Sequence, residues 1–419
     1  MAWLFQQKSL SPSKLTAESV QQFINTHTEY LNQALDTAIR EKSLDDISIQ
    51  RLKESNYVFS GIKTFHELNE AFPKLIDEDG NKIPFNQFLN NVQSINESYN
   101  RTYLKTEYEF AQSSAMMAAR WKEFEKDGDN YYLQYRTVGD KRVRKTHRML
   151  HNITLPFSSK FWDKYFPPNG WNCRCTVVQV RKDKYKMSDE TAAMNAGSQA
   201  TAGKHQEMFM FNPGKEMTTF PAYNAYTIKS CKTCPYRLGK MNLSKKSFPD
   251  NDLCAACRLL NESVLKEQDK QYETVPTQKG TLRVHVKHGK GEKAENVMIG
   301  SFFANKYGYE IDLLPKRDDE KCADSFNKTL GYEEEYKLNQ TPTRNAIDKA
   351  IQKASKQADN IILWFENDIP LNILEDAMAD RVRRCKTLQS ITIVINQKDH
   401  KYMAKDVREG FKIQQTDFK

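Results

Sequence analysis

No hydrophobic run in this 419-residue chain is long enough to cross a bilayer, and none near its start has the length that a signal peptide needs. We therefore expect no membrane partner, and folding in a reducing cytoplasm, where the eight cysteines are better explained by metal binding or packing than by disulfides. A strong excess of one charge is also lacking: the formal net charge of +9 permits a nucleic-acid partner but does not require one. The chain does contain enough apolar residues to form hydrophobic cores, including 22 Phe and 19 Tyr. Its length favours two or three domains.

Four of the cysteines form two CxxC pairs separated by a loop of about twenty residues: Cys231, Cys234, Cys254 and Cys257. Two thiolate pairs on tight turns suit the tetrahedral coordination of Zn²⁺. We predict a structural zinc module within an otherwise irregular segment, residues 186–260, because four thiolates leave no open coordination position for catalysis. The alternative is two disulfides or four free thiols.

The first part of the chain has apolar residues at helical spacing. Residues 1–60 are predicted to form a helical N-terminal region, and long helices are predicted at 84–100 and 103–126. Beyond them the pattern changes to strands at 131–137 and 176–180, with a basic helix between them at 142–151. We therefore expect a mixed α/β domain over residues 61–185.

This domain contains an unusual string, Pro-Pro-Asn-Gly-Trp-Asn-Cys-Arg-Cys at 167–175, preceded by Phe-Trp-Asp at 161–163 and by Arg144 and His147. On these residues the chain resembles the phage Mu F-like head morphogenesis family, the minor head proteins of tailed phages. The resemblance implies a role in capsid assembly, with phage portal and capsid proteins as partners and DNA nearby. It also implies that the protein moves from the cytoplasm of the host bacterium into the phage head.

The same region contains a second group of metal-binding residue types. His147 and His151 share a face if they lie on one helix, and Cys173 and Cys175 point the same way if they lie on one strand. The four residues can form a His₂Cys₂ zinc site. The alternative is that the site binds no metal, with the cysteines packed in a small core and the histidines exposed or hydrogen-bonded. We favour this alternative because CxC spacing is a weaker signal for zinc than CxxC.

Residues 261–280 are polar with few bulky aliphatics and are predicted to be a linker. The last part, residues 281–419, combines strands and helices and is predicted to be an α/β domain with a mixed sheet. Strands are expected at 282–286, 309–314, 322–326, 332–338, 361–365 and 391–395, and helices at 294–307, 343–358 and 371–385.

Two of these strands carry candidate catalytic residues. Asp324 lies on one, and Glu335 and Lys337 project from one face of the next. Carboxylates on neighbouring strands can hold a divalent cation such as Mg²⁺, which acidifies water and neutralises phosphate charge. Lys337 can orient the attacking water, and Glu295 on the preceding helix is a further candidate acid. The acids just before Glu335 leave the register open, because a slip of one residue turns a different carboxylate to the site.

The order of these elements resembles the PD-(D/E)xK nuclease core. The whole tail is similar to the C-terminal toxin domain of CdiA-type contact-dependent inhibition proteins. The residues that carry this likeness are Phe302–Ala304, Ile311–Pro315, Asp324, Glu335, Lys337, and Gln357–Ala358 before the apolar strand at 361–363. The resemblance implies a restriction-endonuclease-like fold and metal-dependent phosphodiester hydrolysis in tRNA or DNA, with an immunity protein as a further partner. One departure is that Ser325 stands beside Asp324 where the motif has proline.

The chain is therefore predicted to be a multidomain α+β protein, a phage minor head protein carrying a C-terminal nuclease toxin. One alternative is a non-enzymatic assembly protein whose tail binds DNA or the portal. Another is a metal-independent RNase of barnase or RelE type, in which His285 or His288 acts as general acid or base.

Overall fold

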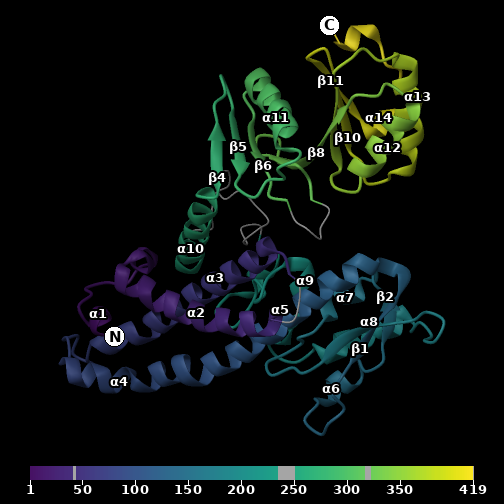
Figure 1. The fold of residues 1–419 in the computed structure, drawn as a ribbon. Coiled ribbons are helices and arrows are strands. Elements are labelled where there is room, and N and C mark those ends of the chain that lie inside the picture. Colours follow the sequence, from purple (N-terminus) through teal and green to yellow (C-terminus); the bar gives the residue numbers. More distant parts are fainter. Residues whose placement is uncertain (41–43, 235–250, 317–321, 419) are drawn as a thin grey trace. The chain divides into compact units, whose positions relative to one another are not determined.

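The computed structural model describes residues 1–40, 44–234, 251–316 and 322–418 (Figure 1). These residues form two compact units, Met1–Leu265 and Lys266–Lys419. Among them, no helix combines the length and apolar character needed to span a membrane.

Long helices dominate the first unit (Figure 1). The predicted helices at 84–100 and 103–126 are confirmed, and a π-helical segment, Ser98–Tyr103, joins them. Asp45 begins one helix by accepting a hydrogen bond from the Ser48 backbone N–H at 2.9 Å, which satisfies one of the free donors of the first turn. The helices of this layer are α1 (Ala2–Phe5), α2 (Glu18–Ile39), α3 (Asp46–Ala71), α4 (Phe85–Glu97) and α5 (Leu104–Asp127).

A small antiparallel sheet follows, with strand order β2-β1-β3. Its strands are β1 (Tyr132–Arg136), β2 (Thr154–Pro156) and β3 (Thr176–Val180), and both outer strands pair with β1. The short helices around it are α6 (Lys145–Arg148), α7 (Phe161–Tyr165), α8 (Glu190–Ala200) and α9 (Pro213–Glu216). The basic helix expected at 142–151 is therefore only the four residues of α6.

Helix α8 lies in the segment that was expected to be irregular. It is capped by Asp189, which accepts a hydrogen bond from the Ala192 N–H at 2.7 Å. A Cβ at Gly197 would lie 2.4 Å from the Tyr165 ring, so α8 approaches α7 through its small residues. Small residues give little hydrophobic signal in a sequence, which is why the pattern did not reveal this helix.

The predicted linker at 261–280 is instead largely helix and strand, because α10 spans Asp252–Asp269 and β4 spans Tyr272–Val275. Leu260 of α10 is buried, and its side chain fills the space that a Cβ would take at Gly61 of α3. The boundary between the two units falls within α10. The regions 1–60, 61–185 and 186–260 share one compact unit, since the same apolar core contains Leu31, Phe110 and Phe220.

The second unit is built on one sheet with strand order β11-β10-β9-β8-β7-β6-β5-β4. Strands β5/β6, β8/β9 and β9/β10 pair in parallel and the other neighbours are antiparallel. The mixed sheet is confirmed, and the predicted strands are found within a few residues of their expected bounds, except that the strand expected at 322–326 is Ser325–Asn327 and leaves Asp324 just before it. The remaining elements are β5 (Thr281–His285), α11 (Lys293–Tyr307), β6 (Glu310–Leu313), β7 (Ser325–Asn327), β8 (Tyr332–Asn339), α12 (Arg344–Ala354), β9 (Asn360–Phe365), α13 (Leu371–Arg384), β10 (Ser390–Ile395), β11 (Lys398–Met403) and α14 (Ala404–Gly410).

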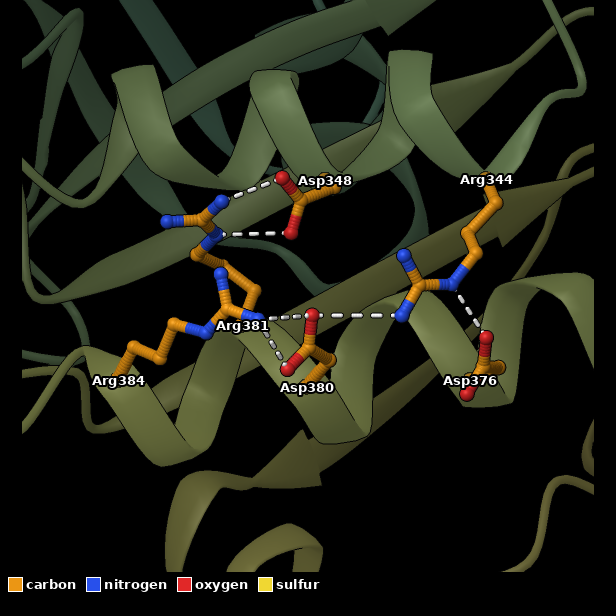
Figure 2. Close-up of polar contacts among 6 residues, drawn as sticks. All are labelled: Arg344, Asp348, Asp376, Asp380, Arg381 and Arg384. Atoms are coloured by element: carbon orange, nitrogen blue, oxygen red, sulfur yellow. Dashed lines mark hydrogen bonds and ion pairs between the residues drawn. The ribbon is translucent and has the colours of Figure 1, made fainter.

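Helices cover both faces of this sheet (Figure 1). Ile361 and Leu363 of β9 pack with α12 and α13, whereas Ile362 and Trp364 pack in the core that contains α11. Strand β9 is buried on both faces, which explains its continuous apolar sequence. Figure 2 shows that α12 and α13 are also joined by a network of ion pairs between aspartates and arginines.

Candidate active site

The predicted catalytic residues meet where β7 begins beside β8. The antiparallel register pairs Ser325 with Glu334, and the next step of that register places Asp324 opposite Glu335. The Tyr336 backbone N–H donates to Asp324 Oδ2 at 2.9 Å, which fixes the carboxylate against β8. Lys337 Nζ donates to Glu335 Oε1. The structure therefore brings Asp324, Glu335 and Lys337 together.

Glu335 is fully buried, and only one of its oxygens is paired. Its Oε2 atom has no hydrogen-bond partner among the described residues. Burial and the nearby charge of Asp324 raise the pKa of Glu335 to about 8, against the opposing effect of Lys337. Burial lowers the pKa of Lys337, but the charges of Glu335 and Asp324 outweigh burial and leave that pKa above its usual value. A side-chain hydrogen bond with Asp324 adds to the raised pKa of Glu335, so the two carboxyl groups share a proton when no cation is bound, and a cation between them would replace that proton.

A cavity of about 90 Å³ opens beside Asp324. It has room for several water molecules, so a hydrated cation fits in it. Glu292, Lys316 and Gln357 also line the cavity. It is therefore polar and contains charges of both signs.

The acid predicted on the preceding helix lies away from the cavity. Glu295 is exposed on α11 and is not among the residues that line the cavity. Glu292, at the N-cap of α11, lines it, and its charge contributes to the raised pKa of Lys337. The helix begins one residue earlier than the sequence predicts, at Lys293, which makes Glu292 its N-cap residue.

His288 supports this site. Its Nδ1 donates to the Leu314 carbonyl at 2.5 Å, and its Nε2 accepts from Asn296 Nδ2 at 3.1 Å. The same amide nitrogen lies 3.0 Å from Asp324 Oδ1 and donates to it as well. His285 Nε2 bonds to Gln271, and burial lowers the pKa of this histidine. Because both ring nitrogens of His288 are engaged, it positions Asn296 and Asp324, and the geometry gives it no free nitrogen for proton transfer.

The CxxC pairs lie in the first unit. Cys231 belongs to a 3-10 turn, Lys229–Thr233, Cys234 follows it, and Cys254 and Cys257 lie one turn apart at the start of α10. All four are free thiols in this structure. Burial first, and then the charges of the other three thiols, raise the pKa of Cys257 to about 12. Among the described residues, these four cysteines do not form a group whose sulfur atoms all lie within 4.8 Å of one another. The loop between the pairs, residues 235–250, lies outside the described residues, and zinc binding here stays a prediction.

The His/Cys group of the first unit is only partly assembled as predicted. His151 is exposed, and its Nδ1 accepts from the Thr137 backbone N–H at 3.1 Å. His147, by contrast, is buried with Cys173 and Cys175. A hydrogen bond from the neighbouring thiol and then the His147 ring hold the pKa of Cys173 well below its usual range, against burial, while that of Cys175 is raised.

Comparison with known proteins identifies part of the first unit. Residues 80–178 match the protein family described as Phage Mu protein F like protein. The putative capsid assembly protein F of Escherichia phage Mu is 41% identical over 84 residues, which is 20% of this chain and 19% of that protein. The Mu-like prophage FluMu F protein of Haemophilus influenzae is 32% identical over 124 residues, 28% of this chain and 27% of that protein. No solved structure matches.

These matches confirm the predicted Mu F-like region. The chain spans only about a fifth to a quarter of the length of the curated relatives it matches. The family match ends well before the second unit, whose resemblance to nucleases stays a prediction.

Proposed function

We propose that this chain is a phage head-assembly protein whose second unit is a metal-dependent nuclease. The head-assembly role, with phage portal and capsid proteins as partners, is supported by the match of residues 80–178 to the Mu F-like family and by the capsid-assembly name of one relative.

The nuclease activity is proposed from one observation. Across β7 and β8, Asp324 and Glu335 face each other beside Lys337, and the Oε2 atom of the fully buried Glu335 is unpaired. A carboxylate just before β7 and another on β8 are oxygen ligands of the kind that Mg²⁺ takes, usually with water completing its shell. The donor set therefore fits a hard divalent cation, and of the two acids Asp324 also lines the neighbouring cavity.

Asp324 and Glu335 would hold that cation, which supplies acidified water and neutralises phosphate charge when it is bound. Asn296 and the Tyr336 N–H orient Asp324 so that its carboxylate stays in place. Lys337 is a quarter exposed, so its ammonium can reach a phosphate oxygen or a water at the edge of the site. We propose phosphodiester hydrolysis in tRNA or DNA as the reaction.

The experiment uses the purified full chain with plasmid DNA and with total tRNA, in Mg²⁺ or in EDTA. We expect cleavage of one substrate in Mg²⁺ and none in EDTA. Asp324→Asn and Glu335→Gln should each lower the rate by about 10²–10⁴, as expected when a group that acts on the transition state is removed. Glu295→Gln is the matched control and should leave the rate unchanged. Binding of nucleic acid without Mg²⁺-dependent cleavage would instead support the non-enzymatic assembly protein.

The toxin role rests on the fusion of this unit to a head protein, and it includes an immunity protein as a proposed partner. Expression of the full chain in bacteria should stop growth, and the Glu335→Gln chain should not. Equal growth of both strains, with equal amounts of protein, would contradict the toxin role and leave the nuclease assay unaffected.

A further inference from the structure

Three metal-binding side chains converge in the first unit, far from the proposed nuclease residues in the sequence. His147 comes from α6, and Cys173 and Cys175 come from the segment that leads into β3. All three are buried, at 2%, 5% and 6% exposure. One donor atom from each lies within 4.8 Å of the other two.

The distances fit a shared ion. Each sulfur lies 3.7 Å from Nδ1 of His147. With Zn–N near 2.0–2.1 Å and Zn–S near 2.3 Å, a tetrahedral zinc separates a nitrogen ligand from a sulfur ligand by about 3.6 Å. The observed separation is therefore the one that coordination requires.

Hydrogen bonding alone explains this arrangement less well. A ring nitrogen has either one hydrogen or one lone pair in the ring plane, so Nδ1 can serve only one of two sulfurs as a hydrogen-bond partner. Yet the two sulfurs are equally distant from it. The other ring nitrogen, Nε2, is buried without a hydrogen-bond partner among the described residues. A cation bound at Nδ1 engages both sulfurs at once, whereas Nε2 stays without a partner in either case.

Two side chains beside the three residues have partners outside the cluster. Tyr135 donates its hydroxyl proton to Asn169 Oδ1 at 2.8 Å, with Cys175 also within hydrogen-bonding reach of the hydroxyl, and Arg144 Nη2 donates to the Trp171 carbonyl at 2.6 Å. Arg174, between the cysteines, points outward to a bidentate ion pair with Asp140, at 2.7 and 2.8 Å. The two segments are therefore held together around the cluster, and its three donors are left facing one another.

We propose that His147, Cys173 and Cys175 bind one Zn²⁺ ion through Nδ1 and the two Sγ atoms, with water in the fourth position. Soft thiolates and an imidazole select zinc over magnesium or calcium. The ion fastens the α6 loop to the start of β3, within the region that matches the Mu F-like family. It is a different site from the one predicted at the CxxC pairs.

The first test measures zinc per chain by mass spectrometry of the purified full-length protein. The Cys173→Ser/Cys175→Ser variant should lose one equivalent of zinc relative to the wild type. The control variant Cys322→Ser/Cys385→Ser removes two cysteines of the second unit and should lose none. An unchanged zinc content in the first variant, or an equal loss in both, overturns the proposal.

A second measurement separates this site from the CxxC pairs and does not depend on removing its cysteines. In a Cys231→Ser/Cys234→Ser chain loaded with Co²⁺, we expect thiolate-to-cobalt charge-transfer bands in the near ultraviolet and visible bands of a tetrahedral ion. Adding His147→Ala should shift or abolish the visible bands, whereas adding His151→Ala should not. Absence of both sets of bands before His147 is changed, or equal effects of the two histidine variants, overturns the assignment.

Discussion

Replacement of Lys63 by methionine tests how the first unit tolerates charge in its core. Lys63 of α3 and Glu107 of α5 form an ion pair at 2.5 Å, and their side chains are only 1% and 4% exposed. The second carboxylate oxygen of Glu107 accepts from the Tyr226 hydroxyl. Methionine keeps most of the length of the lysine side chain, so the variant chiefly removes the ammonium and leaves Glu107 without a cation.

The expected cost follows from protonation. Burial raises the pKa of Glu107 from its ordinary 4.5 even beside Lys63. Without the Lys63 ammonium, the least costly response of Glu107 at pH 7 is to take up a proton. This costs about 3 kcal/mol, because pH 7 lies 2.5 units above the ordinary pKa of 4.5 and each unit is worth about 1.4 kcal/mol. This agrees with the ~3–5 kcal/mol seen when one partner of a buried pair is removed. Because the pKa is raised in the folded state, the penalty grows as pH rises above 4.5 and is under about 1 kcal/mol at pH 5.

Urea unfolding followed by tryptophan fluorescence measures this effect, because four of the five tryptophans lie in the first unit. Lys63→Met should lose about 3 kcal/mol at pH 7, and Lys63→Met/Glu107→Gln should recover most of it. Lys53→Met, whose partner Asp36 is 55% exposed, is the control and should lose less than about 1 kcal/mol. Equal losses for Lys63→Met at pH 5 and pH 7, or no recovery in the double variant, would refute the reasoning.

Three further substitutions test other contacts. Gly214→Ala places a Cβ 2.1 Å from the Trp121 Cβ, so α9 must move, and we expect a loss of about 1–3 kcal/mol in urea unfolding. Asp348→Asn breaks the paired ion bridge to Arg381 shown in Figure 2, whose side chains are 14% and 11% exposed, and should cost about 1.5–3 kcal/mol. The more exposed pairs of the same network should each cost under about 1 kcal/mol. Burial raises the pKa of Glu67 to about 7, so the wild type loses stability as pH rises from 4.5 to 7, and Glu67→Gln should gain a few kcal/mol over the wild type above pH 7 and nothing near pH 4.5.

The sequence predicted part of the sheet of the second unit well because two neighbouring strands are buried on both faces. Strands β9 and β10 are continuous apolar runs, and such short runs are typical of buried strands, so the sequence alone predicts them. Strand β11 was missed because Lys398–Met403 is mostly polar, with three charged residues, and lies at the sheet edge, where such residues limit pairing with other chains. It joins β10 through Asn396 and Gln397, both with positive φ, a tight turn that the apolar pattern does not report.

The alternation of side chains along a strand does not by itself predict which residues of two strands face each other in the candidate site. Alternation along β8 put Glu335 and Lys337 on one face, but it left open whether Glu335 or a neighbouring acid met Asp324. The pairing of Ser325 with Glu334 decides this, and it depends on hydrogen bonds between strands that a sequence does not show. Glu292 was missed for a related reason: a helix cap is placed by the turn before the helix, whose geometry only the fold specifies.

A stability measurement tests whether the charge of Glu335 stabilises or destabilises the folded chain. Burial and Asp324 raise the pKa of Glu335 to about 8, so the metal-free wild type loses stability as pH rises from 4.5 to 8. At pH 7 this cost is about 3 kcal/mol. Glu335→Gln has no charge to bury, and Lys337 keeps water and the charge of Asp324, so in EDTA we expect the variant to unfold at higher urea than the wild type.

A residue whose charge stabilises the fold would behave in the opposite way, because its replacement would lower stability. Functional sites, in contrast, often retain groups that destabilise the folded chain. The prediction is therefore a variant that is more stable and cleaves about 10²–10⁴ times more slowly. Mg²⁺ should raise the stability of the wild type more than that of Glu335→Gln, because only the wild type keeps both carboxylates. A Glu335→Gln chain that is less stable than the wild type in EDTA at pH 7 would mean that Glu335 is held in place for the fold, and would remove the main physical argument for a cation between β7 and β8.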